Sequence, residues 1–478
     1  MPKFLMLTVA CLLLEFNSTL QADDRPNILL ISIDDLNDWV GCLGGHPQAR
    51  TPNIDRLARR GTLFTNAHCQ SPVCNPSRAS LLTGRYPHST GIYFLNPPLT
   101  QAPALKDVPT LPEHFARNGY RTMAVGKIFH GNDKQFFQEY GGNNGGFGPR
   151  PAKKLSQPHG HPLWDWGVFP NDDAKMPDTK ATNWAIDKLK QNYNQPFLLG
   201  VGFYRPHVPM YASQKWFDLH PRSQIKLPRV NADDRNDLSQ YAIDLTNVEH
   251  VSPEHEWVVS AGQWEHAVQA YLASVTFADH CVGRVLDALD ASPHADNTIV
   301  VLFSDHGFHL GEKQRWAKRT LWEDGTRVPI IISAPGHPIN QKTNRPAELL
   351  DLFPTLLELA DLALDPSQEG QSLVPLMADP NRAWPHPAIT SFGPGNYAVR
   401  STHHRFIQYH DGSRELYDHR TDPHEWTNLA SDPQHAETIA AHAAHLPTRE
   451  HPLLPGNSTG HKAFAASNQR LLERLGSR

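Results

Sequence analysis

The chain has 478 residues, of which 39% are hydrophobic and 19% charged, so it is long enough to bury a sizeable core. This length excludes a peptide hormone, a small stapled scaffold and a bare binding module, and it fits one large α/β domain with an appendage or two to three units. The 44 Lys and Arg residues and 49 Asp and Glu residues give a formal net charge of -5, which provides no general attraction for nucleic acid or anionic lipid. An anionic substrate must therefore be bound by local positive charge.

The first segment has the layout of a secretory signal. Lys3 precedes an apolar run over residues 4–14, and polar residues follow before a small-residue end at Ala22. The run is too short to span a membrane. We therefore predict a signal peptide over residues 1–22 and an exported protein, periplasmic or secreted, without a membrane span. A lipid anchor at Cys11 and a disordered start of a cytosolic enzyme are the alternatives.

Apolar β-rich runs alternate with helical patterns along the rest of the chain. The runs predict buried strands of a largely parallel sheet at residues 27–33, 122–125, 196–202, 298–303 and 328–333. The helical patterns between them cover residues 54–60, 111–118, 179–191, 264–291 and 347–360. This alternation predicts an α/β fold with helices on both faces of the sheet and ligands at the carboxyl ends of its strands.

Other stretches lack this alternation. Residues 139–173 and 221–255 are rich in Gly, Pro and His, and we expect these long excursions to shape a substrate pocket. After about Pro385, short alternating segments such as residues 405–409 and 415–417 predict a smaller α+β unit packed on the first.

The stretch from Cys74 to Arg85 reads CNPSRASLLTGR. A cysteine directly before a helix-starting Pro and Ser lies at a helix N-terminus, where free N–H groups and the helix dipole favour an anion. With Arg78 beside it, this arrangement allows either a reactive thiolate or a buried structural cysteine. The stretch matches C-x-P-S-R-x-x-x-L-T-G-R, the signature of type I sulfatases, at all eight specified positions. The resemblance implies that a maturation enzyme oxidises Cys74 to Cα-formylglycine.

Two pairs of polar residues follow predicted strands, namely Asp34-Asp35 and Asp305-His306. Adjacent carboxylates repel unless a cation binds between them, and oxygen ligands favour Ca²⁺ or Mg²⁺, although Asp34-Asp35 taken alone is an ordinary acidic turn. The similarity to sulfatases implies that both pairs and the oxygen at residue 74 bind one Ca²⁺ per chain, with Mg²⁺ less expected. The later pair is Asp-His rather than Asp-Asn or Asp-Gln, a departure shared with iduronate-2-sulfatases. His is a softer ligand than Ca²⁺ prefers.

Basic residues extend the resemblance to the iduronate-2-sulfatase branch. Two residues separate Lys127 from His130, as in that branch, whereas arylsulfatases typically have one. The segment around His207 resembles the one that supplies a sulfate-binding His, and the segment ending at Lys318 resembles the one that supplies a second Lys. The resemblance implies a sulfate-binding set of Lys127, His207 and Lys318 and a catalytic set that adds Cys74, Arg78 and His130.

Residues 415–429 also resemble the sulfatase tail, so the resemblance covers nearly the whole chain after the predicted signal. It implies an alkaline-phosphatase-like fold, with a large mixed, mostly parallel sheet between helices over residues 23–385 and a smaller C-terminal α+β subdomain over residues 386–478. The implied function is hydrolysis of O-sulfate esters, most directly exo-acting removal of a 2-O-sulfate from a uronic acid or a related sugar of a sulfated polysaccharide. A formylglycine-dependent phosphonate or phosphate monoester hydrolase and an inactive glycan-binding homologue are the alternatives.

Overall fold

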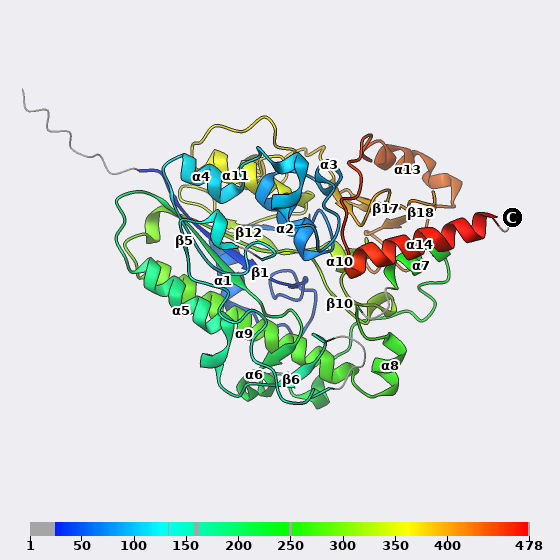
Figure 1. Cartoon of the computed structure of the whole chain (residues 1–478), viewed down its shortest axis with the longest axis horizontal. Helices are drawn as coiled ribbons and strands as arrows, with labels where there is room; N and C mark the ends of the chain where they lie inside the picture. Colours follow the sequence, from blue (N-terminus) through cyan, green and yellow to red (C-terminus); the bar gives the residue numbers. More distant parts are fainter. Residues whose placement is uncertain (1–23, 132, 157–161, 248–250, 477–478) are drawn as a thin grey trace, which may run out of the picture.

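The computed structural model describes residues 24–131, 133–156, 162–247 and 251–476 (Figure 1). The predicted signal peptide over residues 1–22 lies outside the described residues. Within these four ranges, no helix is both long enough and apolar enough to cross a membrane.

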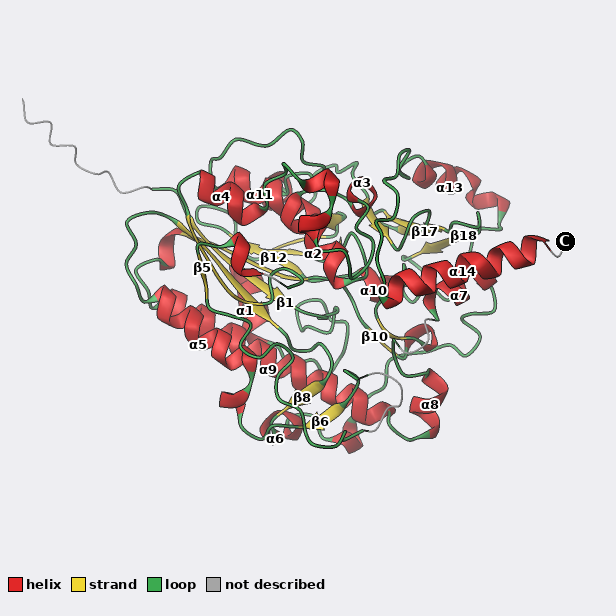
Figure 2. Cartoon of the chain, in the orientation of Figure 1, coloured by secondary structure: helices red, strands yellow, loops and turns green. Residues whose placement is uncertain are grey.

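An eight-stranded sheet forms the centre of the molecule (Figure 2). Its strands, in spatial order, are β13 (Gln341–Thr343), β2 (Thr62–Phe64), β12 (Ile330–Ser333), β9 (Thr298–Ser304), β1 (Asn27–Ile33), β7 (Phe197–Phe203), β4 (Arg121–Gly126) and β5 (Glu139–Tyr140). All neighbours from β9 to β5 are parallel, whereas β12 runs antiparallel to both β9 and β2. The prediction of a mixed, mostly parallel sheet is confirmed, but the run at residues 328–333 contributes an antiparallel strand rather than another parallel one.

Helices cover both faces of the sheet, which explains why its central strands are apolar throughout (Figure 1). One face carries α1 (Pro52–Arg60), α5 (Pro177–Leu189) and α9 (Trp264–Asp290), and the other carries α2 (Cys74–Thr83), α4 (Leu111–Arg117) and α11 (Leu352–Leu359). Successive side chains of β1 point to opposite faces, so Leu29 and Ile31 belong to the core around α9, and Ile28 and Leu30 to the core around α11.

A four-stranded antiparallel sheet lies in the C-terminal part of the chain. It consists of β15 (Ala388–Ser391), β16 (Tyr397–Arg400), β17 (His404–Gln408) and β18 (Arg414–Asp418). Helix α13 (Ala436–Ala443) contacts β17, and α14 (Thr459–Gly476) packs on α7 (Gln240–Thr246). The predicted smaller C-terminal α+β unit is confirmed, and its boundary between residues 385 and 386 stays a prediction.

Shorter elements connect these layers. Two-stranded ladders pair β3 (Ala67–His68) with β14 (Ala347–Glu348), β6 (Trp166–Val168) with β8 (Met210–Ala212), and β10 (His309–Leu310) with β11 (Trp316–Ala317). Short helices are α3 (Pro87–Thr90), α6 (Gln214–Asp218), α8 (His255–Ser260), α10 (Glu323–Thr326) and α12 (Val374–Ala378).

The helix predicted over residues 347–360 is wrong at its start. Its first two residues form β14, and α11 begins only at Leu352. The Glu348 N–H donates to the Asp351 carboxylate at 2.9 Å, and the Leu350 N–H donates to the Gln70 side chain at 3.0 Å. These side-chain acceptors cap a 3-10 turn over Leu349–Asp351, which separates β14 from the start of α11. The other four predicted helices are present, with bounds that differ by at most two residues.

Candidate active site

Parallel strands bring the residues predicted from the sequence to one edge of the sheet. Strands β9, β1, β7 and β4 are adjacent and parallel, so their carboxyl ends lie together. The residues that follow these strand ends are Asp34 and Asp35 after β1, Asp305 and His306 after β9, Lys127 after β4, and His207 after β7.

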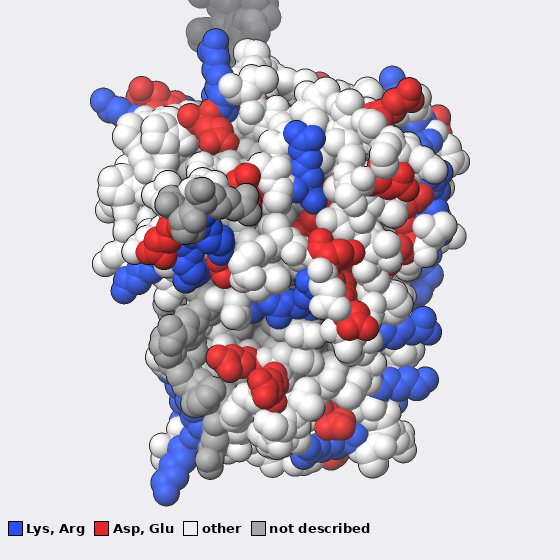
Figure 3. All heavy atoms as spheres, turned by 90° about the vertical axis from the view of Figure 1, so that its right-hand side faces the viewer, with Lys and Arg blue, Asp and Glu red and all other residues white. Residues whose placement is uncertain are grey.

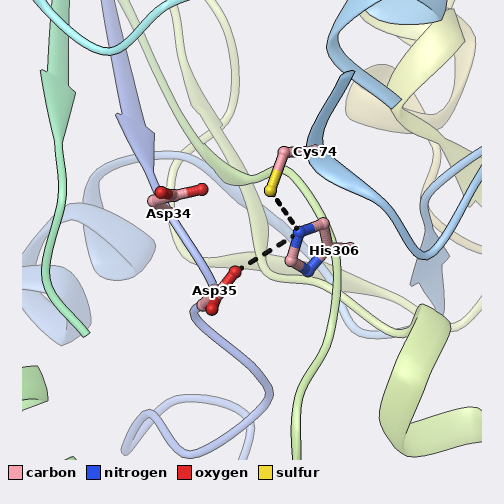
Figure 4. Close-up of side chains that lie close together, drawn as sticks. All are labelled: Asp34, Asp35, Cys74 and His306. Carbon is pink, nitrogen blue, oxygen red and sulfur yellow. Dashed lines mark hydrogen bonds and ion pairs between the residues drawn. The ribbon is translucent and has the colours of Figure 1, made fainter. Parts of the chain in front are cut away.

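Cys74 is the first residue of α2 and points its side chain at this edge (Figure 4). Its Sγ lies 3.2 Å from Nε2 of His306, and Oδ1 of Asp35 lies 3.3 Å from the same nitrogen. Cys74 is buried and, like the other described cysteines, free. The predicted place at a helix N-terminus is therefore confirmed. Burial raises the pKa of the Cys74 thiol, against the opposing effect of Lys127 and Lys318.

Arg78, one turn along α2 from Cys74, is 1% exposed and holds three strand ends together. Its Nε donates to Asp305 at 2.9 Å, and its Nη2 donates to Asp34 at 3.2 Å. Its Nη1 donates to the Ser32 hydroxyl at 3.1 Å and to the backbone carbonyls of Lys127 and Ile128 at 2.8 Å each. One guanidinium thus fixes the carboxyl ends of β1, β4 and β9 relative to the helix that carries Cys74.

Two buried lysines pair with the acidic residues. Nζ of Lys127 lies 2.6 Å from Asp34, and Nζ of Lys318 lies 2.6 and 2.8 Å from the two carboxylate oxygens of Asp35. Burial acts to lower the pKa of each lysine, but the neighbouring carboxylates raise both above the usual value. Burial acts to raise the pKa of Asp34, but Lys127 and other positive groups hold it well below its usual range. Both lysines are therefore charged.

The acidic cluster has the composition of a divalent-cation site. Its members are Asp34, Asp35, Cys74 and His306, whose ligand atoms all lie within 4.8 Å of one another. Nδ1 of His306 pairs with the Gly307 carbonyl at 3.0 Å, which leaves the Nε2 lone pair facing the cluster. Burial raises the pKa of Asp35 to about 7, so further positive charge is needed to keep this carboxylate ionised. The residues present thus fit a divalent cation, with the Cys74 sulfur at the place of the oxygen that formylglycine would supply.

Asp305, the remaining predicted ligand, lies beside this cluster. Its Oδ2 is 3.6 Å from Nε2 of His306 and is shared with Arg78, and its Oδ1 accepts a hydrogen bond from the Asp35 N–H at 3.2 Å. The structure therefore brings all five predicted ligands together.

A cavity of about 170 Å³ lies beside Cys74. The predicted residues Lys127, His130, His207 and Lys318 line it. The His207 ring stacks on Phe147 with the ring centroids 4.5 Å apart, and its Nδ1 pairs with the Val208 carbonyl at 2.6 Å. Burial lowers the pKa of His207 well below its usual value and that of His130 to about 3. Both imidazoles are therefore neutral.

Sequence reasoning missed the apolar wall of this cavity and one basic residue. The wall includes Leu95, Phe147, Leu163, Trp164, Val251 and Phe308. Four of these come from the stretches at residues 139–173 and 221–255, whose length did indicate a pocket but not which side chains would face it. Arg319, which directly follows Lys318, also lines the cavity.

The face of the molecule in Figure 3 does not repeat this concentration of positive charge. On the face in Figure 3, Lys and Arg side chains are interspersed with Asp and Glu. The positive groups that could bind an anion are instead gathered at the sheet edge, as the negative net charge led us to expect.

The fold and the site together define a hydrolase that acts on an anionic ester. The fold provides an alkaline-phosphatase-like sheet, and the site provides a buried cluster of cation ligands and a cavity lined by Lys127, Lys318 and Arg319. The chain belongs to the sulfatase family. The family described as Sulfatase matches residues 26–362, and the one described as N-sulphoglucosamine sulphohydrolase, C-terminal, matches residues 311–451. The protein is a sulfuric ester hydrolase.

Individual relatives agree with this assignment. A sulfatase of Formosa agariphila is 43% identical over 440 residues, which cover 89% of this chain and 87% of the relative. Iduronate 2-sulfatase of Homo sapiens is 33% identical over 402 residues, covering 78% and 71% of the two chains. Delta 4,5-hexuronate-2-O-sulfatase of Bacteroides thetaiotaomicron is 29% identical over 446 residues, covering 89% of each.

Solved structures share the fold. A 2-O GAG sulfatase superposes with a TM-score of 0.69 at 24% identity, covering 88% of this chain and 90% of its own. Phosphonate monoester hydrolase of Agrobacterium radiobacter superposes with a TM-score of 0.71 at 21% identity, covering 88% and 94%. The architecture is therefore common to hydrolases of sulfate and phosphonate esters.

Proposed function

We propose that the protein removes O-sulfate from a sulfated glycan with a Cα-formylglycine made from Cys74. The observation that carries the proposal is the position of Cys74, whose Sγ lies among the ligand atoms of Asp34, Asp35 and His306 and also borders the cavity. An oxygen at the same position would face the cation ligands and the substrate at once. Formylglycine supplies, when hydrated, one hydroxyl that attacks sulfur and a second whose deprotonation expels sulfate and restores the aldehyde.

The basic residues neutralise the charge of the sulfate in this proposal. Lys127 and Lys318 are charged and line the cavity, and Arg78 shares the Asp34 carboxylate with Lys127. A sulfate ester repels any nucleophile that carries negative charge, so positive groups fixed around the sulfur lower the barrier to attack.

Two proton transfers complete the proposed reaction. When the sulfur–oxygen bond to the sugar breaks, the departing alkoxide takes a proton, and we assign its donation to Lys318, which is charged and lines the cavity. His207 lines the same cavity, and a bound sulfate would favour its protonated form, in which Nε2 can donate a hydrogen bond to a sulfate oxygen. The second proton transfer releases the sulfate from residue 74. Neutral His130 would accept the proton of the remaining hydroxyl at residue 74, while the bond between the carbon that carries this hydroxyl and the sulfate oxygen breaks.

Asp34, Asp35, Asp305 and His306 would hold one divalent cation with the oxygen at residue 74, and we propose Ca²⁺ rather than Mg²⁺. The carboxylate ligands suit a hard cation, and Ca²⁺ tolerates the irregular geometry of such a mixed set better than Mg²⁺. The cation would lower the proton affinity of the attacking hydroxyl.

The proposed substrate is a 2-O-sulfated uronic acid at the non-reducing end of a glycan chain, attacked by exo action. Support comes from the Lys127–His130 spacing, from the Asp305-His306 pair and from two relatives whose names describe 2-O-desulfation of iduronate or hexuronate. The proposal also includes export, which rests on the apolar run at residues 4–14, and maturation by a formylglycine-generating enzyme.

Sulfate release from a small panel tests the proposal. The panel contains a 2-sulfated uronate disaccharide, a 6-sulfated glucosamine, a sulfated algal oligosaccharide, an aryl sulfate and a phosphonate monoester. The enzyme is co-expressed with a maturation enzyme, assayed with Ca²⁺ and compared with Cys74→Ala, and mass spectrometry of the Cys74 peptide reports formylglycine.

Sulfate release confined to the 2-sulfated uronate is the expected result. Release from another sugar alone would keep the reaction and replace the substrate. Hydrolysis of the phosphonate alone, with formylglycine in place, would overturn the proposal in favour of the phosphonate alternative. No hydrolysis by the matured enzyme would favour a glycan-binding role.

A further inference from the structure

Arg319 lines the cavity beside Cys74 and is 5% exposed. Its Nη2 donates to the Thr459 hydroxyl at 3.0 Å. Its Nε and Nη1 have no hydrogen-bond partner among the residues that the structure describes. Burial lowers the pKa of Arg319 to about 10, so the guanidinium is still charged at neutral pH.

Some buried arginines of this chain have carboxylate partners, whereas Arg205, Arg315 and Arg319 each have at least one guanidinium nitrogen without a partner among the described residues. Of these three, only Arg319 lines the cavity beside Cys74. Arg78 pairs with Asp34 and Asp305, and Arg405 pairs with Glu323 and Glu425. Burying a charge without a partner destabilises the folded protein, and its N–H groups lose their bonds to water without replacement. The arrangement is explained if the partner of Arg319 is brought by a ligand.

The backbone holds Arg319 in a fixed position relative to the reacting group. Ala317 and Arg319, on either side of Lys318, both adopt left-handed conformations with φ of 71° and 78°. Non-glycine residues keep such conformations only where their surroundings enforce them. The Arg319 N–H donates to the Pro72 carbonyl at 3.2 Å, which ties it to the segment directly before α2, and Thr459 ties the guanidinium to α14.

We propose that Arg319 binds a second acidic group of the substrate, separate from the sulfate that is hydrolysed. The inference rests on the proposed function, because the substrate must place its sulfate ester at residue 74. The other lysines and arginines that line the described cavity are Lys127 and Lys318, which already pair with Asp34 and Asp35. Among the lysine and arginine side chains that line the described cavity, Arg319 is therefore the one whose N–H groups are available for a further anion.

The chemistry of the guanidinium suits the oxygens of a carboxylate or a sulfate, which accept charge-assisted hydrogen bonds. The second acidic group is accordingly the carboxylate of the sulfated uronic acid itself or a sulfate on the neighbouring sugar. Arg319 would select substrates with two acidic groups over singly charged sulfate esters, which makes it a specificity-determining residue.

The test compares Arg319→Gln with wild type on four substrates. These are a 2-sulfated uronate disaccharide, the same compound with its carboxyl reduced to an alcohol, that alcohol with a second sulfate on the neighbouring sugar, and an aryl sulfate. Arg315→Gln is the matched control, because Arg315 is also 5% exposed and also has an Nε without a partner in the described chain, but it does not line the cavity.

We expect Arg319→Gln to lower kcat/KM about 100-fold on the substrate whose second acidic group it binds, mainly through KM, because one partner of a buried charged pair is lost. For the aryl sulfate, which lacks a second acidic group, kcat/KM should fall by less than about threefold. If Arg319→Gln lowers kcat/KM for the 2-sulfated uronate but not for its alcohol, Arg319 binds the carboxylate. If it lowers kcat/KM only for the alcohol that carries a second sulfate, Arg319 binds that sulfate.

Other outcomes would overturn the inference. An equal loss on all four substrates would assign Arg319 to positioning Lys318 rather than to binding, and no loss on any would remove it from recognition. Wild-type enzyme that hydrolyses none of the four would instead refute the proposed function, and this inference with it. Chemical unfolding gives a second readout: Arg319→Gln should be as stable as wild type or more stable, because it removes an uncompensated charge, whereas a clear loss of stability indicates a structural residue.

Discussion

Arg78→Lys is the substitution that most directly tests how this active site is held together. It keeps the positive charge beside Asp34 and Asp305 but removes the planar guanidinium. The guanidinium donates five hydrogen bonds, two to carboxylates, one to a hydroxyl and two to backbone carbonyls. A lysine ammonium has only three donors on a single nitrogen, so it cannot reach three strand ends at once.

The expected loss in the free energy of unfolding follows from the hydrogen bonds that Arg78→Lys removes. At least two of the five buried partners lose their hydrogen bond. Leaving a buried partner unsatisfied costs about 1–3 kcal/mol, so the free energy of unfolding should fall by about 2–6 kcal/mol. Sulfate release should fall as well, because the carboxyl ends of β1, β4 and β9 are no longer fixed relative to Cys74.

Urea unfolding of matured wild-type and variant enzyme measures the free energy, and sulfate release is assayed in parallel. Arg85→Lys is the control, since Arg85 closes the same sequence signature but is 24% exposed on its side chain and lies 3.9 Å from the nearest oxygen of Glu369. A surface pair of this kind contributes about 0–1 kcal/mol. Equal changes in the two variants would refute the argument that the guanidinium joins the strand ends.

Further changes have expected outcomes of their own. Gly202→Ala would place a Cβ 2.2 Å from the Lys127 carbonyl oxygen, so we expect a loss of about 1–3 kcal/mol in urea unfolding together with reduced sulfate release. For Glu425, burial acts to raise the pKa but Arg405 and other groups lower it to about 2 from an ordinary 4.5, so its stabilisation is present above about pH 4.5 and is lost as the pH falls towards 2. Glu425→Gln should accordingly be less stable than wild type at neutral pH and show a shallower loss in acid-unfolding curves, and parallel curves would contradict this. A chelator should abolish sulfate release, and Ca²⁺ should restore it better than Mg²⁺; release that persists in the chelator would exclude a required cation.

The sequence predicts the positions of the proposed cation ligands well, because Asp34-Asp35 and Asp305-His306 each follow a buried strand directly. An apolar run of seven residues that ends in Asp34-Asp35 specifies both a buried strand and the place of the carboxylates. Parallel strands then bring the pair Asp305-His306 to the same edge without further information. The geometry of this part of the site is therefore a consequence of strand direction.

The rest of the site depends on contacts that no local pattern encodes. Phe147 and Trp164 reach the cavity from long segments without regular periodicity, so the sequence indicates a pocket there but not its lining. The direction of β12 is likewise set by its neighbours, because a four-residue apolar run is equally compatible with a parallel or an antiparallel strand. Whether Arg319 has a partner is a property of the folded structure alone.

The balance of charge around residue 74 explains why cation and substrate should depend on each other. Three carboxyl groups face three basic side chains: Asp34, Asp35 and Asp305, and Arg78, Lys127 and Lys318. Such a set is close to neutral and attracts an anion only weakly. A divalent cation at the acidic cluster would leave positive charge unmatched in a site shielded from water, where its effect on a sulfate group is strong. Binding of the cation and of the anionic substrate should therefore be positively coupled, and by linkage each should tighten the other by the same factor.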